Sequence, residues 1–155
     1  MKNPILLIFA VLPCLLFGVG ATSAKAADSS VTVSVPAIQP WVDTGVFVNI
    51  GDSVSITASG TVYVSGTDPG KTPVGVAGCV ATDNDNIHPG PFLAPGLTCW
   101  SLIGRVGNNP AFEVGTGTSF TAISSGELNL SVDDNYFPDN RGSWTAKITT
   151  VALLP

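Results

Sequence analysis

The spacing of the apolar residues constrains the fold of this chain more than any other feature of its sequence. No long segment repeats at helical spacing, and the runs rich in Val, Ile, Thr and Phe are short and lie between clusters of Gly, Pro, Asn and Asp. Residues 128–132 and 144–148 alternate strictly between apolar and polar side chains. Strict alternation is typical of half-buried strands. The sequence therefore predicts an all-β fold, an antiparallel β-sandwich of the jelly-roll kind.

Turn-forming residues set the expected bounds of the strands. We expect strands at Val31–Val35, Gly45–Asn49, Ser53–Ser59, Thr61–Ser65, Cys99–Val106, Ser119–Ile123, Glu127–Val132 and Ser143–Val151. A turn at Ser59-Gly60 separates the third strand from the fourth. From Gly66 to Pro95 the chain is dominated by Gly, Pro, Asp and Asn, and a connection of this length is usually functional or disordered.

The N-terminus has the layout of a secretory signal. Lys2 precedes an apolar run over residues 5–20, and small residues lead to Ala26. This predicts a signal peptide over residues 1–26, cleaved near Ala26. A retained anchor is the alternative, although the run is short of the roughly 20 apolar residues that a membrane span needs. We expect a secreted or periplasmic protein with a single domain over residues 27–155 and no membrane contact after cleavage.

The charge of the mature chain restricts its partners. From residue 27 onward the sequence holds four basic residues and eleven acidic ones, a net charge of −7. Such an acidic protein is poorly suited to binding nucleic acid or an anionic membrane surface. The same excess of carboxylates is consistent with partial neutralisation by a bound metal.

Two cysteines, Cys79 and Cys99, remain after the signal peptide is removed. In an exported protein a disulfide between them is the default expectation, with two free thiols as the alternative. The bond would close a loop of about twenty residues and contribute ~3 kcal/mol in the loop-entropy model.

The segment 133–140 connects the last two expected strands and is rich in oxygen ligands. It contains Asp133, Asp134, Asn135, Asp139 and Asn140. Carboxylates and amides on one anchored loop favour a hard cation, most naturally calcium. The alternative is a solvated hairpin, because turns use the same residues. By alternation, the alternative for Asp133 is that it points away from Asp134 and only adds charge.

Four stretches of the mature chain carry a family resemblance: 49–60, 101–107, 112–120 and 128–144. In order and content they resemble the PA-IL-type calcium-dependent galactophilic bacterial lectins, which have a galactose-binding-like β-sandwich. The resemblance implies a secreted, calcium-dependent carbohydrate-binding protein, without enzymatic activity, that binds galactose-type sugars through Ca2+.

The resemblance also implies a set of metal ligands. Matched by position, the side chains are Asp134, Asp139 and Asn140. One backbone carbonyl would come from the loop, from Tyr136 or Phe137. Another would come from the end of an early strand, from Val64 or Tyr63. The lectins commonly have Asn in place of Asp139, which makes this site more negative, and the loop here is shorter.

The sugar of these lectins also contacts a His-Pro pair in the long variable connection. His88 and Pro89 occupy the corresponding segment, and Asn135 and Phe137 are further candidates for ligand binding. The polar residue that should follow is replaced by Gly90-Pro91-Phe92. A lone loop histidine is more often an exposed polar residue than a ligand.

The rival interpretations belong to other functional classes. A structural or protein-interaction module, with a stabilising Ca2+ or no metal, fits the departures around His88. A hydrolase is least supported, because one histidine allows no Ser-His-Asp arrangement and two adjacent aspartates cannot readily flank a bond. Trp41, Trp100 and Trp144 are expected in the core or as cover rather than as sugar platforms. The expected partner is a glycan, with a homo-oligomer possible.

Overall fold

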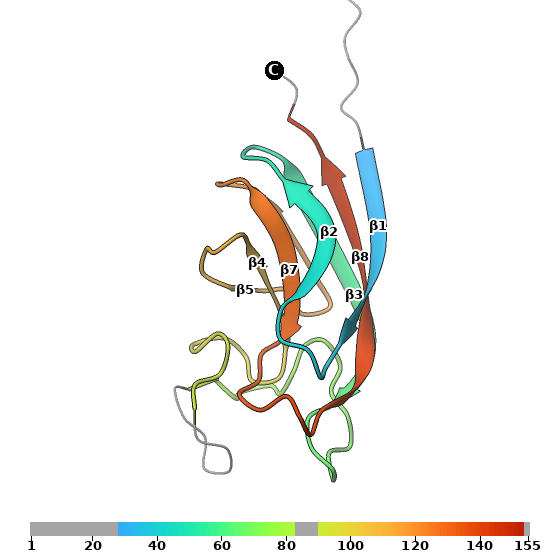
Figure 1. Ribbon diagram of the computed structural model, residues 1–155, viewed down its shortest axis with the longest axis vertical. Helices are drawn as coiled ribbons and strands as arrows, with labels where there is room; N and C mark the ends of the chain where they lie inside the picture. The colour runs from blue at the N-terminus through green and yellow to red at the C-terminus, as the bar shows by residue number, and fades with distance from the viewer. Residues whose placement is uncertain (1–27, 83–89, 154–155) are drawn as a thin grey trace, which may run out of the picture.

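The computed structural model describes residues 28–82 and 90–153, which form two antiparallel sheets packed face to face (Figure 1). The strands are β1 (Asp28–Pro36), β2 (Val42–Val48), β3 (Ser53–Tyr63), β4 (Leu102–Val106), β5 (Phe112–Glu113), β6 (Gly117–Thr121), β7 (Gly126–Val132) and β8 (Arg141–Val151). The described residues contain no helix, and hence no helix that could cross a membrane. The predicted all-β class is confirmed.

The order of the strands identifies the type of sandwich. One sheet has the order β1-β8-β3-β6 and the other β2-β7-β4-β5. Strand β1 pairs with β8, β2 with β7, β3 with β6 and β4 with β5, all antiparallel. These pairings describe one long antiparallel ribbon folded over on itself, which is the jelly-roll arrangement.

The core lies between the two sheets and follows the predicted alternation. The inward-facing side chains of β7 and β8 are almost fully buried: Leu128, Leu130, Val132, Trp144, Ala146 and Ile148. Each large apolar side chain contributes roughly 1.5–3 kcal/mol by its removal from water. Trp144 is in the core, as predicted, and its indole Nε1 donates a hydrogen bond to the Lys71 carbonyl at 3.1 Å.

The predicted turn at Ser59-Gly60 is wrong. Strand β3 continues through both residues and pairs with β8 along its whole length, so the two strands expected on either side are one strand. Gly60 has φ of 111°, and a Cβ there would lie 3.2 Å from the Ser143 carbonyl oxygen. Glycine therefore allows the strand to bend against β8 without ending it.

Strand β4 is shorter than predicted, and β5 was not predicted. The strand begins at Leu102 rather than Cys99, because Trp100 has φ of 55° and turns the chain. Strand β5 has only two residues, too few to produce an alternating pattern.

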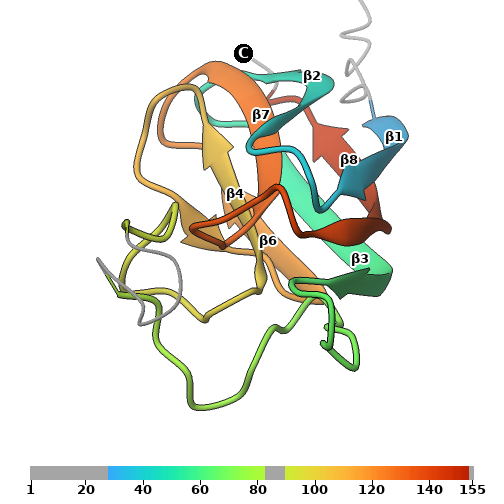
Figure 2. The same cartoon turned by 60° about the horizontal axis from the view of Figure 1, so that its bottom comes forward.

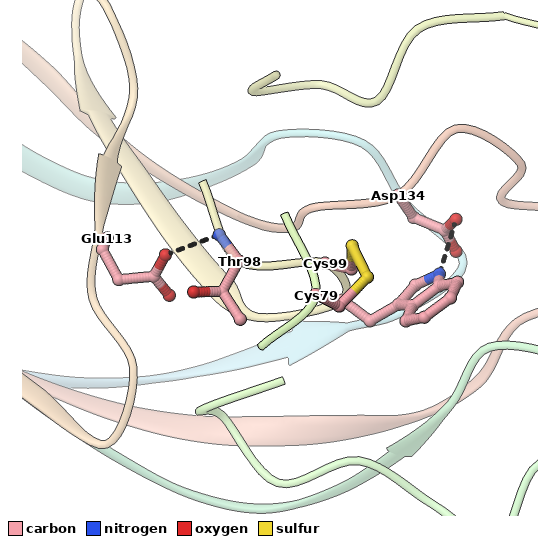
Figure 3. Close-up of a disulfide and its surroundings, with 6 residues drawn as sticks. Cys79, Thr98, Cys99, Glu113 and Asp134 are labelled. Carbon is pink, nitrogen blue, oxygen red and sulfur yellow. Dashed lines mark hydrogen bonds between the residues drawn. A yellow bond between two sulfur atoms is a disulfide. The ribbon is translucent and has the colours of Figure 1, made fainter. Parts of the chain in front are cut away.

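The predicted disulfide is confirmed. Cys79 and Cys99 are bonded, with their Cα atoms 5.5 Å apart and a sequence separation of 20 (Figure 3). Cys99 is buried with Ala81 and Phe92 in a small second core under the long connection. The disulfide and this core attach the described parts of the connection to the sandwich. The predicted signal peptide, residues 1–26, lies outside the described residues.

Candidate metal and ligand site

The connection between β7 and β8, residues 133–140, crosses one end of the sandwich (Figure 2). Its first two residues are fixed by the backbone of segment 92–101. The Trp100 amide donates to the Asp133 carbonyl at 2.9 Å, and the Leu93 amide donates to the Asp134 carbonyl at 3.2 Å. The oxygen-rich loop therefore has a defined position against the chain that the disulfide holds.

Asp134 is the most strongly held side chain of this loop, with 3% of its surface exposed. Its Oδ1 accepts hydrogen bonds from the Asn135 amide at 2.8 Å and from the Trp100 indole Nε1 at 3.2 Å (the dashed line to Asp134 in Figure 3). Its Oδ2 accepts one from Asn140 Nδ2 at 2.8 Å. Burial raises the pKa of the Asp134 carboxyl above its ordinary value, although these hydrogen bonds oppose the shift.

Asn140 joins Asp134 from the far end of the loop. It is 5% exposed, and its Nδ2 also donates to the Ala37 carbonyl at 3.0 Å, so the amide group has one orientation. Because the nitrogen makes both of these bonds, Asn140 Oδ1 can still accept a hydrogen bond or bind a cation. The structure thus brings together Asp134 and Asn140, two of the three side chains expected as ligands.

Besides Asp133 Oδ2, two buried oxygens of the loop accept no hydrogen bond from the described residues. They are Asp139 Oδ1 and Asn140 Oδ1. Leaving a buried acceptor unsatisfied costs about 1–3 kcal/mol, so buried oxygens are normally bound to a donor, a water molecule or a cation. A carboxylate oxygen and an amide oxygen are ligand types that calcium prefers, and the amide belongs to Asn140, which is hydrogen-bonded to the Asp134 carboxylate. The residues present fit a calcium ion.

The predicted carbonyl ligands have different surroundings. Val64 follows the end of β3, where its amide donates to Asp68 Oδ2 at 3.0 Å. The Phe137 carbonyl accepts the Asn140 amide at 3.1 Å and so closes the turn inside the loop. Tyr136 is 40% exposed at the tip. The Phe137 carbonyl therefore already has a hydrogen-bond donor within the loop.

The described residues contain no group of three His, Cys, Asp or Glu side chains placed to hold a metal. This finding is compatible with the proposed ligand set. Only two of its members are carboxylates, and the others are an amide and backbone carbonyls.

Asp133 faces away from this set. Its Oδ1 accepts the Ala94 amide at 2.8 Å, and the residue is fully buried. Its Oδ2 and the hydroxyl of Ser101 are buried without a hydrogen-bond partner among the described residues. Burial, with smaller contributions from Glu113 and Asp134, raises the pKa of the Asp133 carboxyl to about 7. Asp133 is a structural carboxyl under the disulfide-held segment.

Trp100 is the residue that sequence reasoning missed. Its positive φ of 55° directs the indole toward Asp134, and its ring meets Phe92 edge to face at 5.8 Å. The sequence offered no signal for this role, because a tryptophan beside a cysteine is more often simple cover. Phe92, in the position where a polar residue was expected, packs into the second core.

The remaining ligand-binding candidates are partly outside the described residues. His88 and Pro89 both lie there. Asn135 is half-buried, and its Nδ2 donates to the Gly90 carbonyl at 3.3 Å, which joins the acidic loop to the segment that follows His88-Pro89. Phe137 is half-buried in the loop itself.

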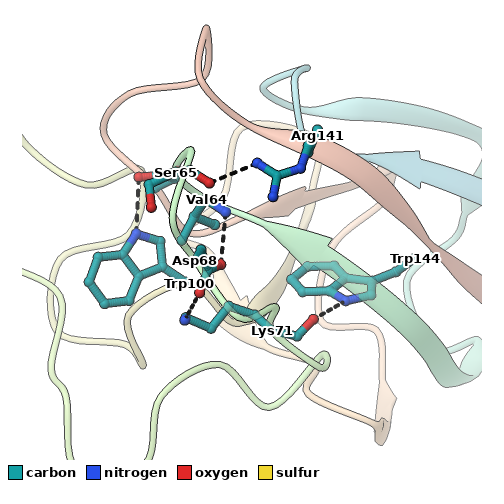
Figure 4. A network of polar contacts seen from close by, with 8 residues as sticks. Val64, Ser65, Asp68, Lys71, Trp100, Arg141 and Trp144 are labelled. Atoms are coloured by element: carbon teal, nitrogen blue, oxygen red, sulfur yellow. Dashed lines mark hydrogen bonds and ion pairs between the residues drawn. The ribbon is translucent and has the colours of Figure 1, made fainter.

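A polar network borders the loop on the side of β3 (Figure 4). Asp68 and Lys71 form an ion pair, and the Lys71 ammonium lies 5.9 Å from the centre of the Trp100 ring. Burial alone would raise the pKa of Asp68, but the bond from Lys71 and backbone donors hold it below the ordinary value. Arg141 donates from Nη1 to the Ser65 carbonyl at 2.8 Å.

An apolar hollow of about 430 Å³ lies elsewhere, along the open edge between β5 and β6. Phe112 and Phe120 line it and meet edge to face with their centres 4.8 Å apart. It contains none of the predicted site residues. This hollow and the predicted site residues are therefore at different places.

Of the comparisons with known proteins, the one with solved structures found a match. No family model matches the chain, and no sequence of a curated protein matches it. Among solved structures, it is similar to the N-terminal domain of EclA, described as a PllA-like lectin, with a TM-score of 0.58 and 21% sequence identity. The match covers 83% of this chain and 99% of that domain. The expected lectin-type fold is thereby confirmed.

Proposed function

We propose that this chain is an exported, calcium-dependent carbohydrate-binding protein that is not an enzyme. The observation that carries the proposal is that Asp139 Oδ1 and Asn140 Oδ1 are buried without a hydrogen-bond partner among the described residues, while Asn140 is itself bonded to the Asp134 carboxylate. Its second support is the fold that the chain shares with a PllA-like lectin domain.

The proposed binding set has distinct roles for its members. Asp134, Asp139 and Asn140 hold the ion, with the carbonyls of Val64 and Tyr136 as further ligands. A bound calcium ion supplies coordination positions at which two neighbouring sugar hydroxyls replace water. The carboxylates then also accept hydrogen bonds from those hydroxyls, and charge-assisted bonds of this kind are stronger than neutral ones.

The walls of the sugar site come from two segments. Tyr136 and Phe137 present aromatic surface in the loop 133–140, and Asn135 of the same loop donates to the Gly90 carbonyl. His88 and Pro89 are further proposed sugar contacts, and galactose-type sugars are the proposed ligands, as the family resemblance implies. Export through the N-terminal signal and a homo-oligomer complete the proposal.

Calorimetry with calcium and then with sugar tests the proposal. Asp134→Ala should abolish both binding events, because the variant loses the carboxylate at the centre of the set. Glu127→Gln is the matched control, since this exposed acid lies at the other end of β7. Full calcium affinity in the Asp134→Ala protein would show that the site is wrongly assigned.

The alternative is a structural or protein-interaction module in which calcium only stiffens the loop. One observation favours it: Phe92, where a polar ligand contact was expected, is buried in the second core. A glycan array in calcium and then in chelator separates the two functions. A sugar signal lost in chelator supports the lectin, whereas a calcium-dependent rise in melting temperature without any sugar signal supports the module.

A further inference from the structure

Arg141 is a cation in a fixed position next to the candidate site. It is exposed at the start of β8, and its guanidinium carbon lies 4.3 Å from the centre of the Tyr63 ring. Its Nη1 donates to the Ser65 carbonyl at 2.8 Å (Figure 4). Stacking and a hydrogen bond together leave the guanidinium little freedom, so little entropy is lost when it binds a further group.

The position of Arg141 places it at the border of the proposed calcium ligands. It directly follows Asn140 in the chain. It is also the cross-strand partner of Tyr63, and its hydrogen bond ends on Ser65, so it spans the residues on both sides of Val64. A ligand that coordinates the ion between Val64 and Asn140 therefore lies near the guanidinium.

The charges around the site leave Arg141 uncompensated. A divalent ion is neutralised by the carboxylates of Asp134 and Asp139. Lys71 and Asp68 neutralise each other as an ion pair. Asp133 is buried against Ala94, away from any ligand. Among the described residues, Arg141 forms no ion pair with a carboxylate.

We propose that Arg141 determines specificity by selecting sugars with an anionic group next to the hydroxyls bound by the ion. The inference rests on the proposed function. A guanidinium has five N–H donors in a planar fork that matches a carboxylate or a sulfate ester, and one of them is used by Ser65. Uronic acids and sulfated sugars share this anionic chemistry.

The experiment compares matched sugars by calorimetry in saturating calcium. Galactose is the neutral reference, galacturonic acid carries the carboxylate, and galactose 6-sulfate carries the sulfate ester. The proteins are the wild type, Arg141→Gln and Arg141→Lys. Lys147→Gln is the control, because Lys147 is an exposed base on the same strand, farther from the loop.

The wild type should prefer at least one anionic sugar over galactose by roughly 1.5-fold to fivefold, as expected for one exposed ion pair. The preference should weaken as salt rises. Arg141→Gln should lose it while keeping its affinity for calcium and galactose, and Arg141→Lys and Lys147→Gln should retain a preference. If galacturonic acid is preferred more strongly, the selected group is a carboxylate. If galactose 6-sulfate is preferred more strongly, it is a sulfate ester.

Three results would overturn the inference. The first is equal affinity of the wild type for neutral and anionic sugars, which leaves the lectin proposal intact if galactose binds. The second is an equal loss of neutral and anionic sugars in Arg141→Gln, which would mean that Arg141 only supports the fold. The third is the absence of any sugar binding in calcium, which ends the proposed function as well.

Discussion

Removing the Asp139 carboxylate should change stability in opposite directions with and without calcium. Asp139 Oδ1 is buried and accepts no hydrogen bond from the described residues. An unsatisfied buried acceptor costs about 1–3 kcal/mol. In chelator, Asp139→Ala removes that cost and loses some packing, so we expect the variant to be as stable as the wild type or more stable by about 1 kcal/mol.

Calcium should reverse this order. At a free calcium concentration of about 100 times the dissociation constant, the wild type gains about 2.7 kcal/mol. For a domain of this size that corresponds to a rise in melting temperature of about 10 °C. Asp139→Ala should gain little, which leaves it about 2 kcal/mol less stable than the wild type in calcium.

Urea unfolding in calcium and in chelator measures both differences. Glu127→Gln is the control for removing a negative charge, because Glu127 is exposed at the opposite end of β7. Asn140→Ala is a useful contrast, since it loses hydrogen bonds to Asp134 and Ala37 and should be destabilised in both buffers. If Asp139→Ala has the same effect in both buffers, or if calcium stabilises it as much as the wild type, the metal-ligand argument is refuted.

Three further predictions concern the surroundings of the site. Trp100→Phe removes the indole bond to Asp134, so calcium affinity should fall several-fold, by the ~1 kcal/mol of one hydrogen bond, in calorimetry. Replacing Cys79 and Cys99 together by serine should lower the free energy of unfolding in urea by about 3 kcal/mol, the value for a loop of this length; an unchanged midpoint would contradict it. In chelator, stability should fall as pH rises from 3.8 to about 7, because folded Asp133 keeps a proton that the unfolded chain releases. Asp133→Asn should reduce that decline and leave the part that Asp134 contributes through its own raised pKa, and an unchanged decline in the variant would assign it to another group.

Some of the candidate site could be read from local sequence. Asp134, Asp139 and Asn140 lie within one short connection, and the alternation on either side predicts that strands hold it. Gly60 shows the limit of local signals. A serine-glycine pair resembles a turn, but its pairing partner on β8 lies far along the chain and keeps the strand continuous.

The sequence by itself determined the class of the fold, the inward residues of β7 and β8, and the acidic loop between them, because these depend on the period of neighbouring side chains. Only the tertiary structure decided how the loop is used. Asn140 meets Ala37 across 103 residues, and Trp100 meets Asp134 across 34. Contacts at such separations depend on how the ribbon folds into two sheets, and no local pattern encodes them. The same packing directs Asp133 under the disulfide-held segment and Asp134 toward Asn140.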